Sequence, residues 1–228
     1  MELNKIYNMD CLEGMKLLDD NSVDMVLTDP PYNINLIPQR GLTNPIENDN
    51  LNKEDFITLL NSCATEFKRI LKQNTFFLTF CGWSTIPEYR QTFDKQFELK
   101  SMPIWIKNNF GIGYYTRPQY EPCLLYLNGN PSPLEKPISD VWKFNKVLKP
   151  IHSCEKPINL IQHIIRHFSK EGNLILDPFM GSGTTAIAAL QTNRKFIGFE
   201  IDEKYCEIAT KRIKPWLEQT RLSPTGLQ

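Results

Sequence analysis

Short apolar segments alternate with longer segments of helical periodicity along most of this chain. The segment 23–28 is mostly apolar and is followed by Asp-Pro-Pro, which predicts a buried strand that ends in a turn. From Lys53 to Lys72 the apolar side chains recur with helical spacing on one face, and 75–80 then predicts another buried strand. The first half of the chain therefore predicts a strand–helix–strand unit.

The second half of the chain continues this alternation. Helical periodicity over 157–168 precedes an apolar strand at 174–176, and a glycine-rich turn follows that strand. A helix, a strand at 196–200 and a last amphipathic helix from about 203 to 218 complete the pattern. Strands that alternate with helices in this way predict an α/β fold with a mostly parallel central sheet and helices on both faces.

Other segments interrupt the alternation. Two strand candidates, 102–107 and 122–127, flank a stretch that contains Gly and Tyr, and they predict a hairpin at the sheet edge. The stretches 33–52 and 128–150 are polar and contain proline, which is typical of functional loops or inserts. A length of 228 residues suits one domain with inserts, so we expect a single domain over 1–228.

Charge and cysteine usage narrow the function classes only slightly. The 26 basic residues equal the 26 acidic residues, so any nucleic-acid surface has to be local. The six cysteines contain no C-x-x-C pair, which favours reduced thiols in a cytoplasm. His163 and His167 are four residues apart, but no third ligand has suitable spacing, so we predict no metal site. No apolar run approaches the roughly 20 residues that span a bilayer, which argues against a membrane role.

The glycine-rich turn at 177–185 is the first segment with a chemical signature. It reads Asp-Pro-Phe-Met-Gly-Ser-Gly-Thr-Thr, and its glycines allow the backbone to approach a ligand closely. Glu200 ends the next strand, where a carboxylate can accept hydrogen bonds from two ribose hydroxyls. The turn also satisfies the loose G-x-G-x-x-G/A dinucleotide pattern, but only about 40 residues follow it, too few for a second nucleotide-binding half. The glycine-rich turn together with Glu200 indicates a nucleoside-containing cofactor.

The Asp29-Pro30-Pro31-Tyr32 segment indicates chemistry on an aromatic amine. The two prolines fix φ and lack N–H donors, so their carbonyl oxygens stay available as acceptors. An exocyclic amine is a poor nucleophile because its lone pair is delocalised into the ring. Acceptors at the Asp29 carboxylate and the Pro30 carbonyl would favour a pyramidal nitrogen, and Tyr32 would stack on the base. The alternative is an ordinary chain reversal in which Tyr32 only packs.

These blocks together resemble the β-class amino-methyltransferases of DNA restriction-modification and phage systems. In that family the D-P-P-Y block precedes the F-x-G-x-G block, as it does here. The resemblance extends from Asp10-Cys11 near the start to 152–157, which is similar to the family segment H-P-T-x-K-P. Ser153 and Cys154 depart from the usual Pro and Thr of that segment. The resemblance implies a Rossmann-like fold that uses S-adenosyl-L-methionine as cofactor.

The resemblance also assigns roles to matching residues. Asp10 and Cys11 border the cofactor adenine, Glu200 binds the ribose, and Lys156 lies at the methionine end. The residues expected at the cofactor are Asp10, Cys11, Asp29, Lys156, Asp177, Phe179, Gly181, Ser182, Gly183, Thr184, Glu200 and Ile201. The residues expected to carry catalysis are Asp29, Pro30, Pro31 and Tyr32.

Aspartate as the first letter of the block usually accompanies adenine N6 methylation in this family, and serine accompanies cytosine N4 methylation. Asp29 therefore favours a site-specific adenine N6 DNA methyltransferase, with cytosine N4 methylation as the alternative. A non-catalytic DNA-binding subunit is an alternative of a different class, and RNA or protein glutamine is a third kind of substrate. A homodimer and a cognate restriction endonuclease are further partners that the family suggests.

A paired adenine has to leave the duplex to reach such a pocket, at a cost of a few kcal/mol. Residues 100–150 hold seven basic and three acidic residues together with several aromatic residues, a mixture suited to phosphates and exposed bases. We therefore expect the target-recognition region at about 108–150, helped by the loop 33–52. The candidate contacts to double-stranded DNA are Arg40, Lys107, Arg117, Lys143 and Lys146.

Overall fold

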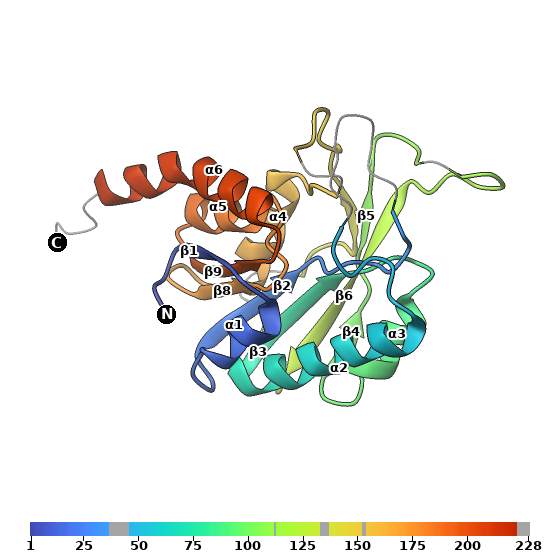
Figure 1. Ribbon diagram of the computed structural model, residues 1–228, viewed down its shortest axis with the longest axis horizontal. Helices are drawn as coiled ribbons and strands as arrows, with labels where there is room; N and C mark the ends of the chain where they lie inside the picture. The colour runs from blue at the N-terminus through green and yellow to red at the C-terminus, as the bar shows by residue number, and fades with distance from the viewer. Residues whose placement is uncertain (37–45, 112, 133–136, 152–153, 223–228) are drawn as a thin grey trace.

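A twisted sheet of nine strands forms the middle of the molecule within the described residues (Figure 1). The computed structural model describes residues 1–36, 46–111, 113–132, 137–151 and 154–222. The strands are β1 (Lys5–Asn8), β2 (Val23–Thr28), β3 (Leu71–Phe80), β4 (Glu98–Ser101), β5 (Ile104–Ile106), β6 (Tyr120–Asn128), β7 (Val141–Lys143), β8 (Leu174–Asp177) and β9 (Lys195–Glu200). The helices are α1 (Cys11–Lys16), α2 (Lys53–Ile70), α3 (Ile86–Phe93), α4 (Ile158–Phe168), α5 (Thr184–Gln191) and α6 (Glu203–Leu222).

The strand order is β1-β9-β8-β2-β3-β6-β5-β7, and β4 pairs with β6 beside this path. The five strands β1, β9, β8, β2 and β3 are parallel to one another, whereas β6 is antiparallel to β3. The mostly parallel sheet is therefore confirmed. The expected hairpin is also present, since β5 pairs with β6 in antiparallel fashion. Its expected position at the sheet edge is wrong, because β7 adds in parallel outside β5.

Helices cover both faces of the sheet, as the alternation predicts. On one face, α1, α2 and α3 bury Met15, Phe67 and Phe93 against apolar residues of the sheet. On the other face, α4, α5 and α6 bury Ile164, Ile187 and other apolar residues in a second cluster (Figure 1). Both faces of the central strands are therefore inaccessible to water, which explains why β2 and β8 are almost continuously apolar.

Local signals fix the boundaries of several elements. The Asn52 side chain accepts a hydrogen bond from the Asp55 backbone N–H and so begins α2. The helix ends at Ile70 and β3 begins at the next residue, so the strand is longer than the predicted 75–80. The periodicity does not predict β1, α1, α3, β4 and β7, because each is too short to repeat it clearly. β7 lies inside the stretch 128–150 that was expected to be irregular.

His163 and His167, the two histidines spaced as possible metal ligands, lie side by side on α4. The rings of His163 and His167 lie 4.5 Å apart between centroids, and His163 also contacts the rings of Trp142 and Phe144. Among the described residues no three His, Cys, Asp or Glu side chains gather as a metal site. Within the same residues no helix combines the length and apolar character needed to cross a bilayer.

Gly183 shapes the turn between β8 and α5. Its φ of 86° is in the left-handed region, where a Cβ is unfavourable, and it is the residue that precedes α5. A Cβ at this position would lie 3.0 Å from the Cβ of Ala209 on α6. Glycine is therefore needed both for the backbone conformation and for the close approach of α6 to the turn.

We expect Gly183→Ala to destabilise the protein more than Gly172→Ala, which is the matched control. Gly172 has a similar φ of 79°, but nothing lies within 4 Å of a Cβ there. Both changes introduce backbone strain, and only Gly183→Ala presses on α6, so its free energy of unfolding should fall by about 1 kcal/mol more. Urea denaturation of both variants measures this difference. Equal losses would show that the contact with Ala209 contributes nothing to stability.

Candidate active site

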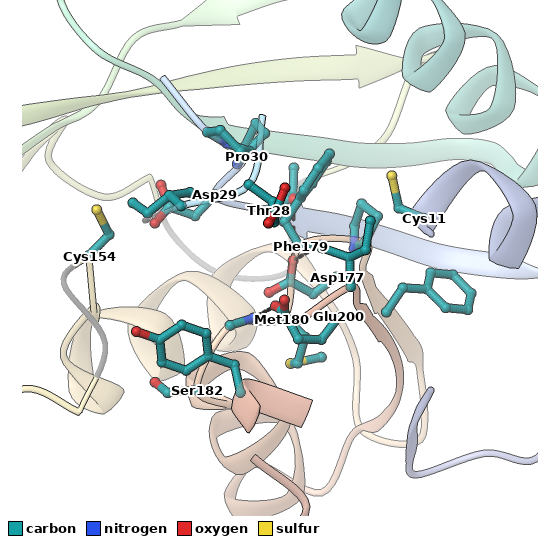
Figure 2. Close-up of a pocket in the computed structure, with 18 of the residues that line it drawn as sticks. Cys11, Thr28, Asp29, Pro30, Cys154, Asp177, Phe179, Met180, Ser182 and Glu200 are labelled. Carbon is teal, nitrogen blue, oxygen red and sulfur yellow. Dashed lines mark hydrogen bonds between the residues drawn. The ribbon is translucent and has the colours of Figure 1, made fainter. Parts of the chain in front are cut away.

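A cavity opens at the carboxyl ends of the parallel strands β2, β8 and β9. It holds about 1190 Å³ of empty space, its open mouth included. The Asp29 block, the glycine-rich turn and Glu200 all line it, although they are far apart in the sequence (Figure 2). Described parts of the stretch 33–52, among them Ile34 and Asp49, line the same cavity. Ligands commonly bind at this edge of an α/β sheet.

Asp29 and Tyr32 follow β2 directly, and their side chains are hydrogen-bonded to each other. The Tyr32 hydroxyl donates a hydrogen bond to the Asp29 carboxylate at 2.6 Å. Burial, with the nearby Asp29 and Glu121 charges, raises the pKa of Tyr32 well above its ordinary value, so the hydroxyl keeps its proton. The Tyr32 ring packs against the core cluster that contains α4. The expected stacking of Tyr32 on a base stays a prediction.

Lys156 completes this corner of the cavity. Only 5% of the residue is exposed, and its ammonium forms an ion pair with Asp29. It also lies 3.0 Å from a Glu121 carboxylate oxygen and 3.3 Å from the Tyr32 hydroxyl oxygen. Burial lowers the pKa of Lys156, but the carboxylates of Asp29 and Glu121 outweigh burial and raise it above the ordinary lysine value. Lys156 is therefore a fixed cation beside Asp29.

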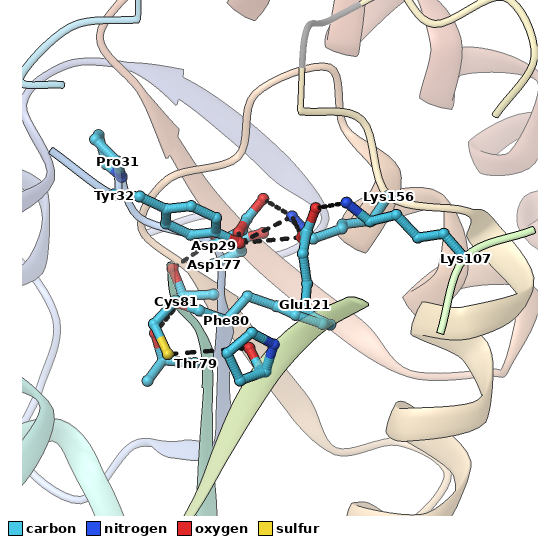
Figure 3. Close-up of polar contacts among 12 residues, drawn as sticks. Asp29, Pro31, Tyr32, Thr79, Phe80, Cys81, Lys107, Glu121, Lys156 and Asp177 are labelled. Atoms are coloured by element: carbon cyan, nitrogen blue, oxygen red, sulfur yellow. Dashed lines mark hydrogen bonds and ion pairs between the residues drawn. The ribbon is translucent and has the colours of Figure 1, made fainter. Parts of the chain in front are cut away.

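Glu121 is a residue of this site that the sequence analysis does not include. It lies on β6, and besides Lys156 its carboxylate contacts the Lys107 ammonium and accepts from the Tyr32 hydroxyl at 3.2 Å (Figure 3). Burial alone would raise the pKa of Glu121, yet the Lys156 and Lys107 cations lower it to about 2. Lys107 was expected to contact DNA, but only 16% of its side chain is exposed and its charge is paired with Glu121.

The glycine-rich turn is held by Glu200 and Arg212. The Gly181 N–H donates to one Glu200 carboxylate oxygen at 2.7 Å, and the Asp202 N–H donates to the other at 2.9 Å. Burial raises the pKa of Glu200, while these backbone donors lower it. Arg212 donates to the Ser182 carbonyl and to the Glu155 carboxylate, both at 2.7 Å. This arginine, also missed by the sequence analysis, ties the turn to the segment that carries Lys156.

Most of the residues expected at the cofactor line the cavity. Gly181, Ser182 and Thr184 do so, whereas Gly183 is not part of the lining and packs on α6. Thr184 is 7% exposed, and its hydroxyl has no hydrogen-bond partner among the described residues. An unpaired buried hydroxyl in a cavity wall is suited to a polar group of a ligand.

Asp177 lies deep in the cavity at the end of β8. Its carboxylate accepts hydrogen bonds from the Thr28 hydroxyl at 3.2 Å and the Phe179 N–H at 3.1 Å. Burial raises the pKa of Asp177 to about 7, and the hydrogen-bond donors lower it only in part. A ligand cation next to Asp177 would favour the ionised carboxylate.

The remaining cofactor candidates lie at the other end of the cavity. Asp10 begins α1, and one of its carboxylate oxygens accepts from the Leu12 N–H at 2.8 Å. Cys11 is buried in the wall, while Ile201 is 47% exposed where it lines the cavity. These residues lie next to Glu200 because β1 pairs with β9 in parallel, with Asn8 opposite Glu200.

The other DNA candidates differ in position. Arg117 and Lys143 are exposed, and Lys146 is half-buried. Arg117 donates to the Gly111 carbonyl at 2.8 Å, and its guanidinium lies over the Phe110 ring. Arg40 lies outside the described residues, as do His152 and Ser153 of the family-like segment.

The comparisons with known proteins agree with this geometry. The sequence matches the N6/N4 DNA methylase family over residues 23–132 and 119–211. The putative methylase YubD of Escherichia coli K12 is 29% identical over 214 residues, which cover 92% of this chain and 90% of YubD. The DNA adenine methyltransferase YhdJ of the same organism is 28% identical over an alignment 251 residues long. The alignment covers 93% of this chain and 83% of YhdJ.

Among solved structures, the M1.HpyAVI–SAM complex is 26% identical, with a TM-score of 0.69. The match covers 91% of this chain and 98% of that one. The expected Rossmann-like methyltransferase fold is confirmed by this likeness. Because the family match extends over most of the sequence, from the strand before Asp29 to α6, the chain belongs to the N6/N4 DNA methylase family.

Proposed function

We propose that this protein transfers a methyl group from S-adenosyl-L-methionine to N6 of an adenine flipped out of duplex DNA. The observation that carries the proposal is the shared cavity. Asp29 and Pro30 line this cavity together with the glycine-rich turn and Glu200. A methyl donor and an aromatic amine held in these two halves would meet next to Asp29.

The residues present suit this cofactor. The ionisable Glu200 carboxylate lies at the strand end where ribose hydroxyls can donate to it, and the unpaired Thr184 hydroxyl is available to a polar group. Phe179 and Phe199 supply apolar surface near Cys11 for an adenine ring. Asp177 can balance an ammonium. The bound cofactor would supply an electrophilic methyl group on a sulfonium.

The protein's own residues prepare the target amine. The Asp29 carboxylate and the Pro30 carbonyl can each accept one N–H bond, which draws the nitrogen toward a pyramidal geometry. Tyr32 and Lys156 hold the Asp29 carboxylate in position by donating one hydrogen bond to each of its oxygens. Preorganised acceptors of this kind act without reorganising at the moment of reaction.

Adenine is favoured over cytosine by two observations. Asp29 stands where adenine enzymes of the family usually carry aspartate, and the relative YhdJ is a DNA adenine methyltransferase. Cytosine N4 methylation is the second candidate, since the matched family includes N4 enzymes. The intact Asp29, Tyr32 and Glu200 argue against a non-catalytic subunit.

DNA would approach the side of the cavity that carries the stretch 108–150. Tyr114 and Tyr115 are each 94% exposed, and their rings contact one another. Together with the exposed Arg117 and Lys143 they are groups suited to phosphates and unstacked bases.

The product of the reaction tests the proposal directly. After incubation with labelled S-adenosyl-L-methionine and duplex DNA of varied sequence, digestion to nucleosides should yield labelled N6-methyldeoxyadenosine. Labelled N4-methyldeoxycytidine would instead establish the second candidate. Absence of any labelled nucleoside would overturn both.

Asp29→Ala should reduce methyl transfer by at least about 100-fold, because the amine loses its charged acceptor. Single-turnover kinetics with saturating cofactor measures the rate. Cofactor affinity, followed by calorimetry, should change much less, which separates a chemical defect from a lost pocket. Normal turnover in this variant would remove Asp29 from its assigned role.

Glu200→Gln should weaken cofactor binding by about 10-fold, since a charged acceptor for the ribose hydroxyls is lost. Because burial raises the pKa of Glu200, the wild-type affinity should also fall as the pH is lowered through that pKa. The variant should lack this part of the pH dependence. Glu203→Gln, an exposed position three residues later, is the matched control and should bind like the wild type. Equal affinities in the two variants would exclude the ribose contact.

Lys143→Ala should weaken the binding of DNA of any sequence by a similar factor. It should also reduce the magnitude of the slope of log K for DNA binding against log salt concentration by about 1. Fluorescence anisotropy over a salt series measures both quantities. Lys211→Ala removes another exposed lysine, on α6 and outside the expected surface, and should leave the slope unchanged. The assignment of the surface fails if the two variants behave alike.

A further inference from the structure

Glu121 belongs to neither sequence block, yet its carboxylate contacts Lys156 and the Tyr32 hydroxyl beside Asp29. We propose that Glu121 is a positioning residue for methyl transfer: it holds the Lys156 ammonium between two carboxylates, so that the Asp29 carboxylate keeps free acceptor capacity for the target amine. The inference rests on the proposed function, because it assigns Asp29 the role of amine acceptor.

The contacts of Lys156 account for all of its donors. An ammonium has three N–H groups, and the structure places three oxygen acceptors around it. These are a carboxylate oxygen of Asp29, a Glu121 oxygen at 3.0 Å and the Tyr32 hydroxyl oxygen at 3.3 Å (Figure 3). Glu121 therefore limits the number of Lys156 N–H groups that donate to Asp29.

Charge balance makes Glu121 necessary to this arrangement. The network holds two cations, Lys156 and Lys107, and two anions, Asp29 and Glu121, and each side chain is at most 21% exposed. Without the Glu121 charge, the two ammonium groups would be left with the Asp29 carboxylate as the one remaining anion of the network, and Lys107 would lose its partner. A buried charge without a partner is costly, so Lys156 would turn fully toward Asp29.

The consequence falls on the reacting amine. One oxygen of Asp29 already accepts from Tyr32 and the other from Lys156, which leaves one lone pair on each. A second lysine N–H at either oxygen would compete with the N–H groups of the base. Glu121 prevents this competition by engaging another Lys156 donor.

The position of Glu121 is fixed by its strand. It lies opposite Trp105 in the β5–β6 pair, and Trp105 is buried. Lys107 holds the other carboxylate oxygen of Glu121 and lies over the Trp105 ring. The carboxylate is therefore held from both sides, which is what a group that positions another requires.

The alternative is that Glu121 only neutralises buried charge and stabilises the fold. Removing one charge of each sign distinguishes the two roles. If Glu121 acts only through net charge, Glu121→Gln combined with Lys107→Met restores neutrality and should recover the rate. If it positions Lys156, the double variant should stay as slow as Glu121→Gln alone.

Single-turnover methylation of duplex DNA is measured for both variants and for Glu121→Asp, which keeps the charge but shortens the side chain. We expect Glu121→Gln to slow transfer by about 10- to 100-fold, with cofactor affinity within about twofold, and Glu121→Asp to be intermediate. Glu98→Gln on the adjacent β4, where the side chain is 66% exposed, is the matched control. A Glu121→Gln rate within twofold of the wild type, or recovery in the double variant, would overturn the proposal.

The pKa of the Lys156 ammonium gives a readout of its contact with Glu121. The groups that face Lys156 are Asp29 and Tyr32 after β2, Cys81 after β3, Glu121 and Cys123 on β6, and Cys154 on its own segment. Glu121 is one of the two carboxylates that raise the pKa of Lys156, so its loss should lower the pH at which the Lys156 ammonium releases its proton.

A measurement without catalysis separates this inference from the proposed function. If the wild type methylates no DNA, the proposed function fails, and nuclear magnetic resonance of the labelled Lys156 side chain still reports the network. The Lys156 pKa should be lower in Glu121→Gln than in the wild type and in Glu98→Gln. Equal values would exclude Glu121 as a partner that fixes the Lys156 cation.

Discussion

Strands β2 and β8 run parallel through the middle of the sheet, with Val26 opposite Leu176, and the rest of the site depends on this pairing. Because both strands point the same way, Asp29 and Asp177 emerge at the same edge although 148 residues separate them. The hydrogen bond from Thr28 to Asp177 links the two strand ends. Burial of both sheet faces leaves this edge as the place where polar groups of the central strands meet a cavity.

Much of this arrangement could be predicted from the sequence, because it depends on local patterns. The apolar run before Asp29 and the Asp-Pro-Pro turn predict a strand that ends at the site, and β2 ends at Thr28. The glycine-rich turn and Glu200 lie after successive strands, so their proximity follows from parallel pairing. Gly183 shows the limit of assigning roles from family motifs. The motif predicts a cofactor contact for Gly183, whereas the positive φ and the close approach of α6 are what require a glycine there.

The charge network could not be predicted, because no pattern in the sequence signals it. Glu121 lies on a strand whose neighbours are mostly apolar, and a single charged residue there is usually directed at solvent. Its partners Lys107 and Lys156 are 14 and 35 residues away, and only the antiparallel β5–β6 pair and the segment before α4 bring them together. For the same reason Lys107 was expected to bind phosphate, as an unpaired cation in a basic stretch would.

The β5–β6 hairpin joins the expected recognition surface to the charge network of Glu121 through a few residues. Lys107 and Gln119 pair across its base, where the Lys107 N–H donates to the Gln119 carbonyl at 2.8 Å. The residues between them carry the exposed tyrosines, whereas Glu121 follows two positions later. A change of residues within 108–118 would therefore leave the contacts of Glu121 with Lys107 and Lys156 in place. The same boundary separates the proposed recognition loop from the proposed methyl-transfer site.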